Sequence, residues 1–174
     1  MNYNNSIGIG EYHTIAMSIS PNDGHDRVDN GVMGLVGASG AIVELIRAHM
    51  YHNRLRYAIP RLAIVDKIGD VLWSLEELAE GMNTTMFHLA ECSFEELHEQ
   101  TYRATRTPTA HKVALNLSSH ANKIRRSVEH GNRRELEIQM RRMLYCCAWM
   151  ARVCGYALPE VVQTNVEKIK GGKP

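Results

Sequence analysis

Residues 34–44, Gly-Leu-Val-Gly-Ala-Ser-Gly-Ala-Ile-Val-Glu, and residues 67–73, Lys-Ile-Gly-Asp-Val-Leu-Trp, are the two stretches that decide the fold. Each lies in a longer segment whose apolar residues recur every three or four positions, which is the spacing of one helix face. These residues are Leu35, Ile42, Leu45, Ile46 and Met50 in the first segment, and Leu62, Val65, Ile68, Leu72, Leu75 and Leu78 in the second. The sequence therefore predicts two long helices, from about Asn30 to His52 and from Pro60 to about Gly81.

Both stretches resemble the motifs of the MazG-like nucleotide pyrophosphohydrolases, which read G-L-x-G-E-x-G-E-V on one helix and E-L-G-D-V-L-W on the next. The positions that keep the motif's glycines and tryptophan are Gly34, Gly37, Gly40, Gly69 and Trp73. The resemblance implies an all-helical protein that binds nucleoside triphosphates and cuts them to monophosphate and pyrophosphate with Mg²⁺. In that family two antiparallel helices, each with acids three residues apart, gather four carboxylates around the metal.

The four acid positions are mostly altered in this chain. They hold Ala38, Ala41, Lys67 and Asp70, so only one carboxylate remains. Because a metal needs that cluster to activate the attacking water, we expect a pseudoenzyme with no catalytic residue and no cofactor. Glu44 and Asp66 could join Asp70 in a shifted Mg²⁺ site, although Lys67 would repel the metal. That site belongs to an enzyme alternative, a pyrophosphohydrolase with rebuilt ligands.

Composition favours one soluble helical domain. The chain has 174 residues, 44% of them apolar and only 6% aromatic, which is long enough to bury a sizeable core. It has no run that approaches the roughly 18 uninterrupted apolar residues of a membrane span, and its polar first residues do not resemble a signal peptide. We therefore expect a cytoplasmic protein with no membrane partner.

Charge is distributed unevenly although the net charge is only +1. Residues 1–98 carry 6 Lys or Arg against 13 Asp or Glu, whereas residues 99–174 carry 14 against 6. This asymmetry predicts either halves that attract each other or an anionic ligand bound by the second half. The alternative is that the charges are ordinary solvated helix faces. Three arginine pairs, at positions 125–126, 133–134 and 141–142, lack interleaved aromatic residues, which argues against nucleic acid as a partner.

The helix order repeats along the chain. After a first short helix at residues 11–17 and the long pair, Thr84 or Thr85 is expected to cap a helix from Met86 to about Leu97. Further helices are expected at about 108–130, 133–153 and 160–170. The order of long, long and short helix thus recurs, with Asp70/Arg142 and Leu97/Ile169 both 72 positions apart. We predict an all-α protein of two tandem MazG-like units, residues 1–98 and 99–174, packed as an internal pseudo-dimer in one globular domain.

The second unit resembles the family at its end. Residues 155–169 resemble the family ending L-G-x-x-L-E-E-V-x-x-x-N-x-E-K-L, so the first unit keeps the front of the motif and the second keeps the back. The second unit's acid positions hold His120, Lys123, Gln139 and Arg142, none of them acidic. The alternative to duplication is a helical extension that packs on the first unit. Because MazG-like proteins form dimers and tetramers, the resemblance also implies a homo-oligomer.

The candidate ligand-binding residues follow from these substitutions. Lys67, His120, Lys123 and Arg142 replace acids with groups that bind phosphate through charge-assisted hydrogen bonds. Asn165 and Lys168 match the family's N-x-x-K, and Trp73 could stack on a base. The remaining candidates are Asp70 and the connector residues His52, Arg54 and Arg56.

Three classes of function stay open. The first is a protein that captures an anionic, cyclic or signalling nucleotide without hydrolysing it. Because the family is common in phage genomes, the resemblance also suggests an anti-defence nucleotide sponge. The second is the Mg²⁺-dependent pyrophosphohydrolase, and the third is a structural or protein-interaction module that binds no nucleotide.

Overall fold

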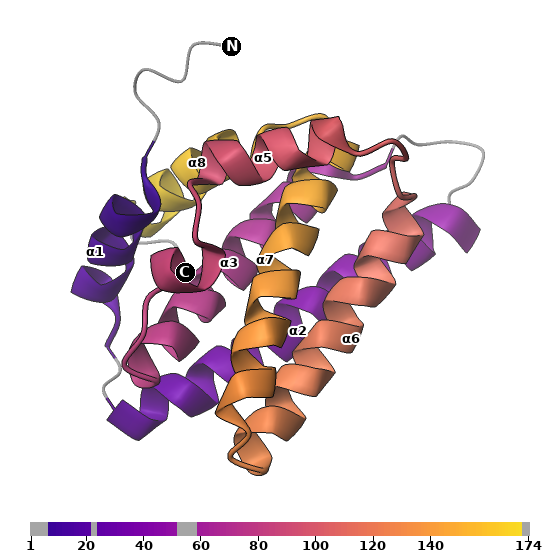
Figure 1. Ribbon diagram of the computed structural model, residues 1–174. Coiled ribbons are helices and arrows are strands. Elements are labelled where there is room, and N and C mark those ends of the chain that lie inside the picture. Colours follow the sequence, from indigo (N-terminus) through magenta and orange to yellow (C-terminus); the bar gives the residue numbers. More distant parts are fainter. Residues whose placement is uncertain (1–6, 22–23, 52–58, 172–174) are drawn as a thin grey trace.

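The computed structural model describes residues 7–21, 24–51 and 59–171, and within these residues the chain forms eight α-helices and no strand. The prediction of an all-α protein is confirmed (Figure 1). The helices are α1 (Ile9–Ile19), α2 (Gly24–Tyr51), α3 (Arg61–Gly81), α4 (Met86–Ala90), α5 (Phe94–Arg103), α6 (Ala110–Glu129), α7 (Arg133–Cys154) and α8 (Leu158–Lys170).

The four long helices form a bundle. Helix α2 contacts α3 and α6, and α7 contacts the same two helices. Helices α5 and α8 pack on one another, α5 also on α7 and α8 also on α3, at the upper end of the bundle in Figure 1. Helix α1 packs against α3, α4 and α8. The last helix of the chain therefore lies beside α3, although about ninety residues separate them in sequence.

Small residues allow α2 and α3 to approach closely. A Cβ atom at Gly31 would lie 2.8 Å from the Leu78 Cβ, and one at Gly34 would overlap the Ser74 hydroxyl. Such distances are incompatible with any larger side chain at either glycine unless the helices separate. The retained motif glycine at position 34 thus has a packing role that does not depend on metal chemistry.

One segment among the described residues, Asp26–Tyr51 of α2, is long and apolar enough, by length and composition, to cross a membrane. The core helix of a bundle meets the same criteria. Helix α2 buries Leu35, Ile42 and Ile46 in the core shared with α3 and α6. Bundle packing thus accounts for part of its apolar character, since 39% of this window is buried, and the cytoplasmic location stays a prediction.

The predicted helix from Met86 to Leu97 is wrong, because the chain forms two helices there. Glu91 has a left-handed backbone (φ 57°) that ends α4. Ser93 then begins α5 with a capping box, in which its hydroxyl accepts from the Glu96 N–H and the Glu96 carboxylate accepts from the Ser93 N–H. A serine followed by glutamate three residues later is a strong local start signal, and here it outweighs continuation of the preceding helix.

Two further boundaries differ from expectation. Helix α2 begins at Gly24 rather than near Asn30. The division drawn between residues 98 and 99 falls inside α5, which is one uninterrupted helix from Phe94 to Arg103. A boundary between two units would therefore have to lie outside α5, before Ser93 or in the stretch that precedes α6.

Candidate functional site

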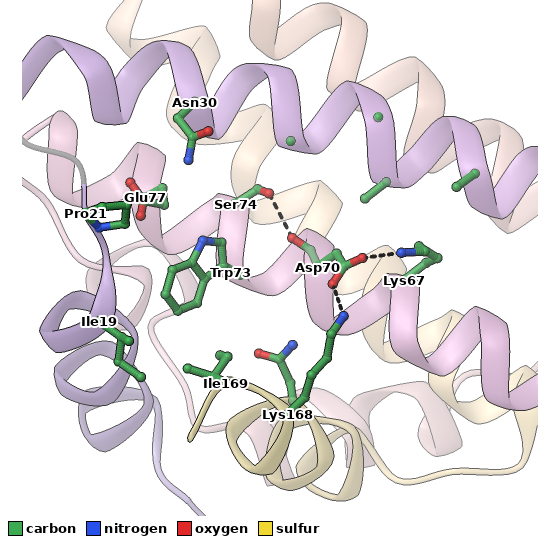
Figure 2. Close-up of a pocket in the computed structure, with 15 residues that line it drawn as sticks. Ile19, Pro21, Asn30, Lys67, Asp70, Trp73, Ser74, Glu77, Lys168 and Ile169 are labelled. Carbon is green, nitrogen blue, oxygen red and sulfur yellow. Dashed lines mark hydrogen bonds and ion pairs between the residues drawn. The ribbon is translucent and has the colours of Figure 1, made fainter. Parts of the chain in front are cut away.

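The face of α3 that is turned toward α2, α8 and the end of α1 borders a pocket of about 730 Å³, called here the main pocket (Figure 2). It lies between helices from both ends of the chain, which the bundle brings together. Its lining residues are Ile19, Pro21, Asn30, Gly34, Gly37, Ala38, Ala41, Lys67, Asp70, Trp73, Ser74, Glu77, Asn165, Lys168 and Ile169.

The main pocket contains all four positions that match the family's acids, Ala38, Ala41, Lys67 and Asp70. Trp73 joins them from α3, one turn after Asp70. Asn165 and Lys168 reach the same pocket from α8. The front of the motif, in residues 34–73, and its back, in residues 165–168, therefore meet in one place.

Close packing of α8 on α3 makes this meeting possible. A Cβ atom at Gly69 would lie 3.0 Å from both Cβ and Cγ of Asn165, so only glycine leaves room for that side chain. The Asn165 Oδ1 atom in turn accepts a 2.8 Å hydrogen bond from the buried Tyr12 hydroxyl. A buried hydrogen bond of this kind is costly to break, because it leaves a polar group unpaired. The contacts of Asn165 thus fix α8 between α1 and α3.

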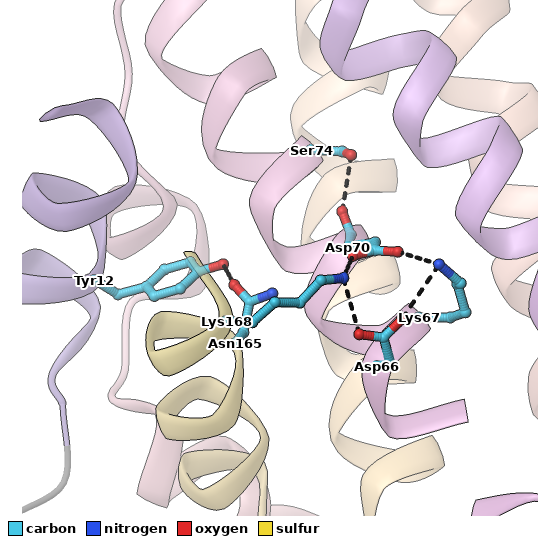
Figure 3. A network of polar contacts seen from close by, with 7 residues as sticks. All are labelled: Tyr12, Asp66, Lys67, Asp70, Ser74, Asn165 and Lys168. Carbon is cyan, nitrogen blue, oxygen red and sulfur yellow. Dashed lines mark hydrogen bonds and ion pairs between the residues drawn. The ribbon is translucent and has the colours of Figure 1, made fainter. Parts of the chain in front are cut away.

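Two lysines and two aspartates form a closed group (Figure 3), and all of them except Asp66 line the main pocket. Asp66, Lys67, Asp70 and Lys168 are called here the Lys–Asp cluster. Lys168 Nζ lies 2.8 Å from Asp66 Oδ1 and 2.9 Å from Asp70 Oδ1. Lys67 Nζ lies 2.6 Å from Asp70 Oδ2 and 3.3 Å from Asp66 Oδ2. The cluster joins α8 to α3, and its formal charges sum to zero.

The contacts within the cluster hold Asp66, Lys67 and Lys168 in their charged forms. The hydrogen bond to Asp70 raises the pKa of Lys67 against the opposing effect of burial. Burial lowers the pKa of Lys168, but its hydrogen bonds to Asp66 and Asp70 outweigh burial and raise it overall. Burial likewise opposes ionisation of Asp66, yet the two lysines lower its pKa. Both lysines are therefore cations at neutral pH.

The three carboxylates proposed for a shifted Mg²⁺ site are not arranged as a set. Glu44 accepts two hydrogen bonds of 2.7 Å from Arg47, and it is not among the residues that line the main pocket. Asp66 and Asp70 each contact two lysine ammonium groups. The oxygens that would bind a metal are thus already bound by cations of the chain itself.

Glu77, which the sequence did not single out as a candidate, is fully buried and lines the main pocket. Neither of its carboxylate oxygens has a hydrogen-bond partner within the described part of the chain. The adjacent Glu76 is also buried, but its Oε2 lies 3.1 Å from His13 Nδ1. A signal was present, because Asp70, Ser74 and Glu77 follow the i, i+4, i+7 spacing of one helix face.

The other predicted cations lie elsewhere. His120 and Arg142 line a second pocket of about 510 Å³, with Tyr145 and Trp149. His120 Nδ1 lies 2.6 Å from Gln139 Oε1, and burial lowers the pKa of this histidine despite that contact. Lys123 lines neither pocket.

The cations that replace the family's acids therefore do not share one pocket. Helices α6 and α7 direct His120 and Arg142 to the second pocket, whereas α3 and α8 direct Lys67 and Lys168 to the main pocket. The connector candidates His52, Arg54 and Arg56 lie outside the described residues.

Comparison of the chain with protein-family models, with curated proteins and with solved structures finds no match. What the main pocket does must therefore follow from its own residues.

Proposed function

We propose that this chain is a degenerate MazG-like protein that binds an anionic nucleotide in the main pocket and releases it intact. The observation that carries the proposal is the convergence of Lys67 and Lys168 on Asp70, in a pocket that Trp73 also lines. A cyclic or signalling nucleotide is the proposed ligand. In a phage, such a protein would act as a sponge for host defence signals.

The Lys–Asp cluster explains why binding would occur without hydrolysis. A metal ion in such a site both neutralises phosphate and lowers the pKa of the water that attacks it. A lysine ammonium supplies positive charge and hydrogen bonds, but it has no open coordination position for a water molecule. The methyl side chains of Ala38 and Ala41 add no metal ligand. The pocket would thus keep the electrostatic part of the family's chemistry and lose the nucleophile.

The duplication that we infer is supported by helix contacts and pocket-lining positions that correspond between the two units. Helix α8 packs on α3 as α5 packs on α7, which is what two units exchanging their last helices would give. Positions 72 apart line the two pockets as Asp70/Arg142 and Trp73/Tyr145. Two pairs of positions 82 apart also line the two pockets, namely Gly34/Asn116 and Ala38/His120. A plain helical extension gives no reason for these pairs.

The geometry also limits the expected affinity. An ammonium group has three N–H donors, and two carboxylates already contact each lysine, so each lysine keeps one donor for a phosphate. Two such contacts contribute about 1.5–3 kcal/mol each, and a base stacked on Trp73 adds about 1–3 kcal/mol. After association costs of at least about 4 kcal/mol, at most about 5 kcal/mol of these contributions remains, so the dissociation constant should be no lower than about 0.2 mM.

Calorimetry in EDTA tests the proposal. The parent chain is titrated with mononucleotides, cyclic mono- and dinucleotides and nucleoside triphosphates, and then with the best ligand at increasing salt. Lys168→Met should weaken binding at least fivefold, whereas Lys170→Met, a change on the same helix outside the pocket, should not. If no nucleotide binds below about a millimolar, the structural-module alternative replaces the proposal.

Two further measurements address the remaining alternatives. Pyrophosphate release from triphosphates with Mg²⁺ over many turnovers, abolished by Asp70→Ala, would favour the pyrophosphohydrolase. Native mass spectrometry would show the size of the assembly, since the homo-oligomer stays a prediction, and would also detect any nucleotide that purifies with the protein.

A further inference from the structure

Glu77 is the least satisfied polar group of the main pocket. Its side chain is 0% exposed, and both carboxylate oxygens lack a hydrogen-bond partner among the residues that the structure describes. A buried acceptor without a donor destabilises the empty protein. A ligand that brings donors to this carboxylate removes that cost, so the pocket favours ligands with N–H groups at this position.

The place of Glu77 relative to the Lys–Asp cluster suits a nucleotide. Glu77 follows Asp70 by seven residues on α3, which corresponds to about 10 Å along the helix axis. Trp73 lies between them on the same face, and its ring lies between Glu77 and the lysine ammonium groups in Figure 2. A nucleotide with its phosphate at the lysines would extend along Trp73 and bring the edge of its base to Glu77.

The two free oxygens of Glu77 discriminate among the bases. A carboxylate accepts two parallel hydrogen bonds and donates none. Guanine presents two adjacent donors, the ring N1–H and the N2 amino group. Adenine and cytosine each present one amino donor beside a ring acceptor, and uracil presents one N–H between two carbonyls. Only guanine therefore satisfies both oxygens of Glu77 without placing an acceptor against one of them.

A residue of α2 extends this pattern. Asn30 lines the pocket beside Glu77 in Figure 2, and a side-chain amide can donate to a carbonyl oxygen. Guanine carries its O6 acceptor next to N1–H. Glu77 and Asn30 together thus offer two acceptors and one donor, which is the complement of the guanine edge.

We infer that the main pocket selects a guanine nucleotide, with Glu77 accepting hydrogen bonds from the base and the Lys–Asp cluster binding the phosphate. The inference rests on the proposed function and adds the identity of the base. Because the carboxylate is covered in the empty pocket, the side chains that cover it must move to admit the base, and Trp73, which lines the same pocket, offers a stacking surface.

The test compares 5′-GMP with 5′-AMP by calorimetry in EDTA, using the full chain. The parent protein should bind GMP on the order of 10- to 100-fold more tightly than AMP, the discrimination expected of a good bidentate contact to a base. Glu77→Gln replaces one acceptor by a donor, so it should abolish the preference for GMP and favour AMP. Glu76→Gln removes a carboxylate from the neighbouring buried position outside the pocket and should leave the ratio unchanged.

Thermal unfolding of each variant establishes that it folds, and Glu77→Met serves as a second variant that removes both acceptors. Equal affinities for GMP and AMP in the parent, or a ratio that Glu77→Gln leaves unaltered, would overturn the guanine assignment. If the guanine assignment is overturned in this way but Lys168→Met still weakens the binding of both nucleotides, the proposed function stands. If neither nucleotide binds, the guanine assignment fails, and the proposed function fails with it only when the cyclic nucleotides and triphosphates also do not bind.

Discussion

Replacing Asp66 by asparagine should tighten the binding of an anionic nucleotide, although the change removes two ion pairs within the cluster. In the parent chain Asp66 Oδ1 lies 2.8 Å from Lys168 Nζ and Asp66 Oδ2 lies 3.3 Å from Lys67 Nζ. Asparagine leaves the cluster with a net charge of +1 and removes one carboxylate contact from each lysine. The asparagine Oδ1 still accepts a hydrogen bond from one lysine, so the other ammonium gains a second N–H donor for a phosphate.

The size of this effect follows from the exposure of the groups. The side chains of Asp66 and Lys67 are 41% and 35% exposed, so solvent screens their interaction with a phosphate. Exposed ion pairs contribute about 0.2–1 kcal/mol, and we expect a gain near the upper end, or roughly fivefold in affinity. The lost contacts should lower the melting temperature by about 2–4 °C, as for about 1 kcal/mol in a chain of this size.

Calorimetry with GMP in EDTA measures the change, and Glu44→Gln is the matched control because it removes one carboxylate that pairs with Arg47 outside the pocket. Nucleotide capture predicts tighter binding for Asp66→Asn and no change for Glu44→Gln. A Mg²⁺ site built from Glu44, Asp66 and Asp70 predicts that both substitutions weaken metal-dependent binding. Unchanged or weaker binding by Asp66→Asn in EDTA would refute the competition between Asp66 and phosphate.

Three other outcomes are expected. Gly34→Ala should cost about 1–3 kcal/mol in chemical denaturation, because its Cβ overlaps the Ser74 hydroxyl, and Ser74→Ala should recover part of that loss in a double-mutant cycle. The Glu76 hydrogen bond raises the pKa of His13, so its stabilisation is complete below pH about 6.5 and is lost as pH rises through the raised value. His13→Gln should flatten that pH dependence in denaturation curves, whereas the exposed His88→Gln should not. Arg142→Glu should leave the affinity for GMP within twofold of the parent value, because Arg142 lines the second pocket. A large loss of affinity would indicate that the nucleotide binds in the second pocket.

Much of the fold could be predicted from local signals. Apolar spacing located the long helices, and Gly155, with its left-handed φ of 83°, ends α7 where expected. The break between α4 and α5 was missed, because it depends on competition between a capping box at Ser93 and a helix that could have continued. Apolar periodicity indicates reliably that a segment is helical, but it indicates less reliably where one helix ends and the next begins.

The candidate site was predicted less completely. The motif resemblance identified Lys67, Asp70, Trp73 and Lys168, all of which line the main pocket. It could not show that Lys168 pairs with Asp70 across 98 positions of sequence, since that contact depends on how α8 packs. Glu77 was missed because adjacent glutamates in a helix are normally solvated. Its burial depends on helices that are distant in sequence.

The charge asymmetry between the two halves now has a structural explanation that also bears on ligand binding. Ion pairs cross between the halves, from Lys168 to Asp66 and Asp70 and from Arg141 to Glu91 at 2.9 Å. These ion pairs neutralise part of the positive charge of the second half with carboxylates of the first half. Because the Lys–Asp cluster is neutral overall, long-range attraction of a phosphate is weak, and affinity must come from directed hydrogen bonds at short range. Salt should therefore weaken nucleotide binding only shallowly in the parent chain and more steeply in Asp66→Asn, where the cluster carries a net positive charge.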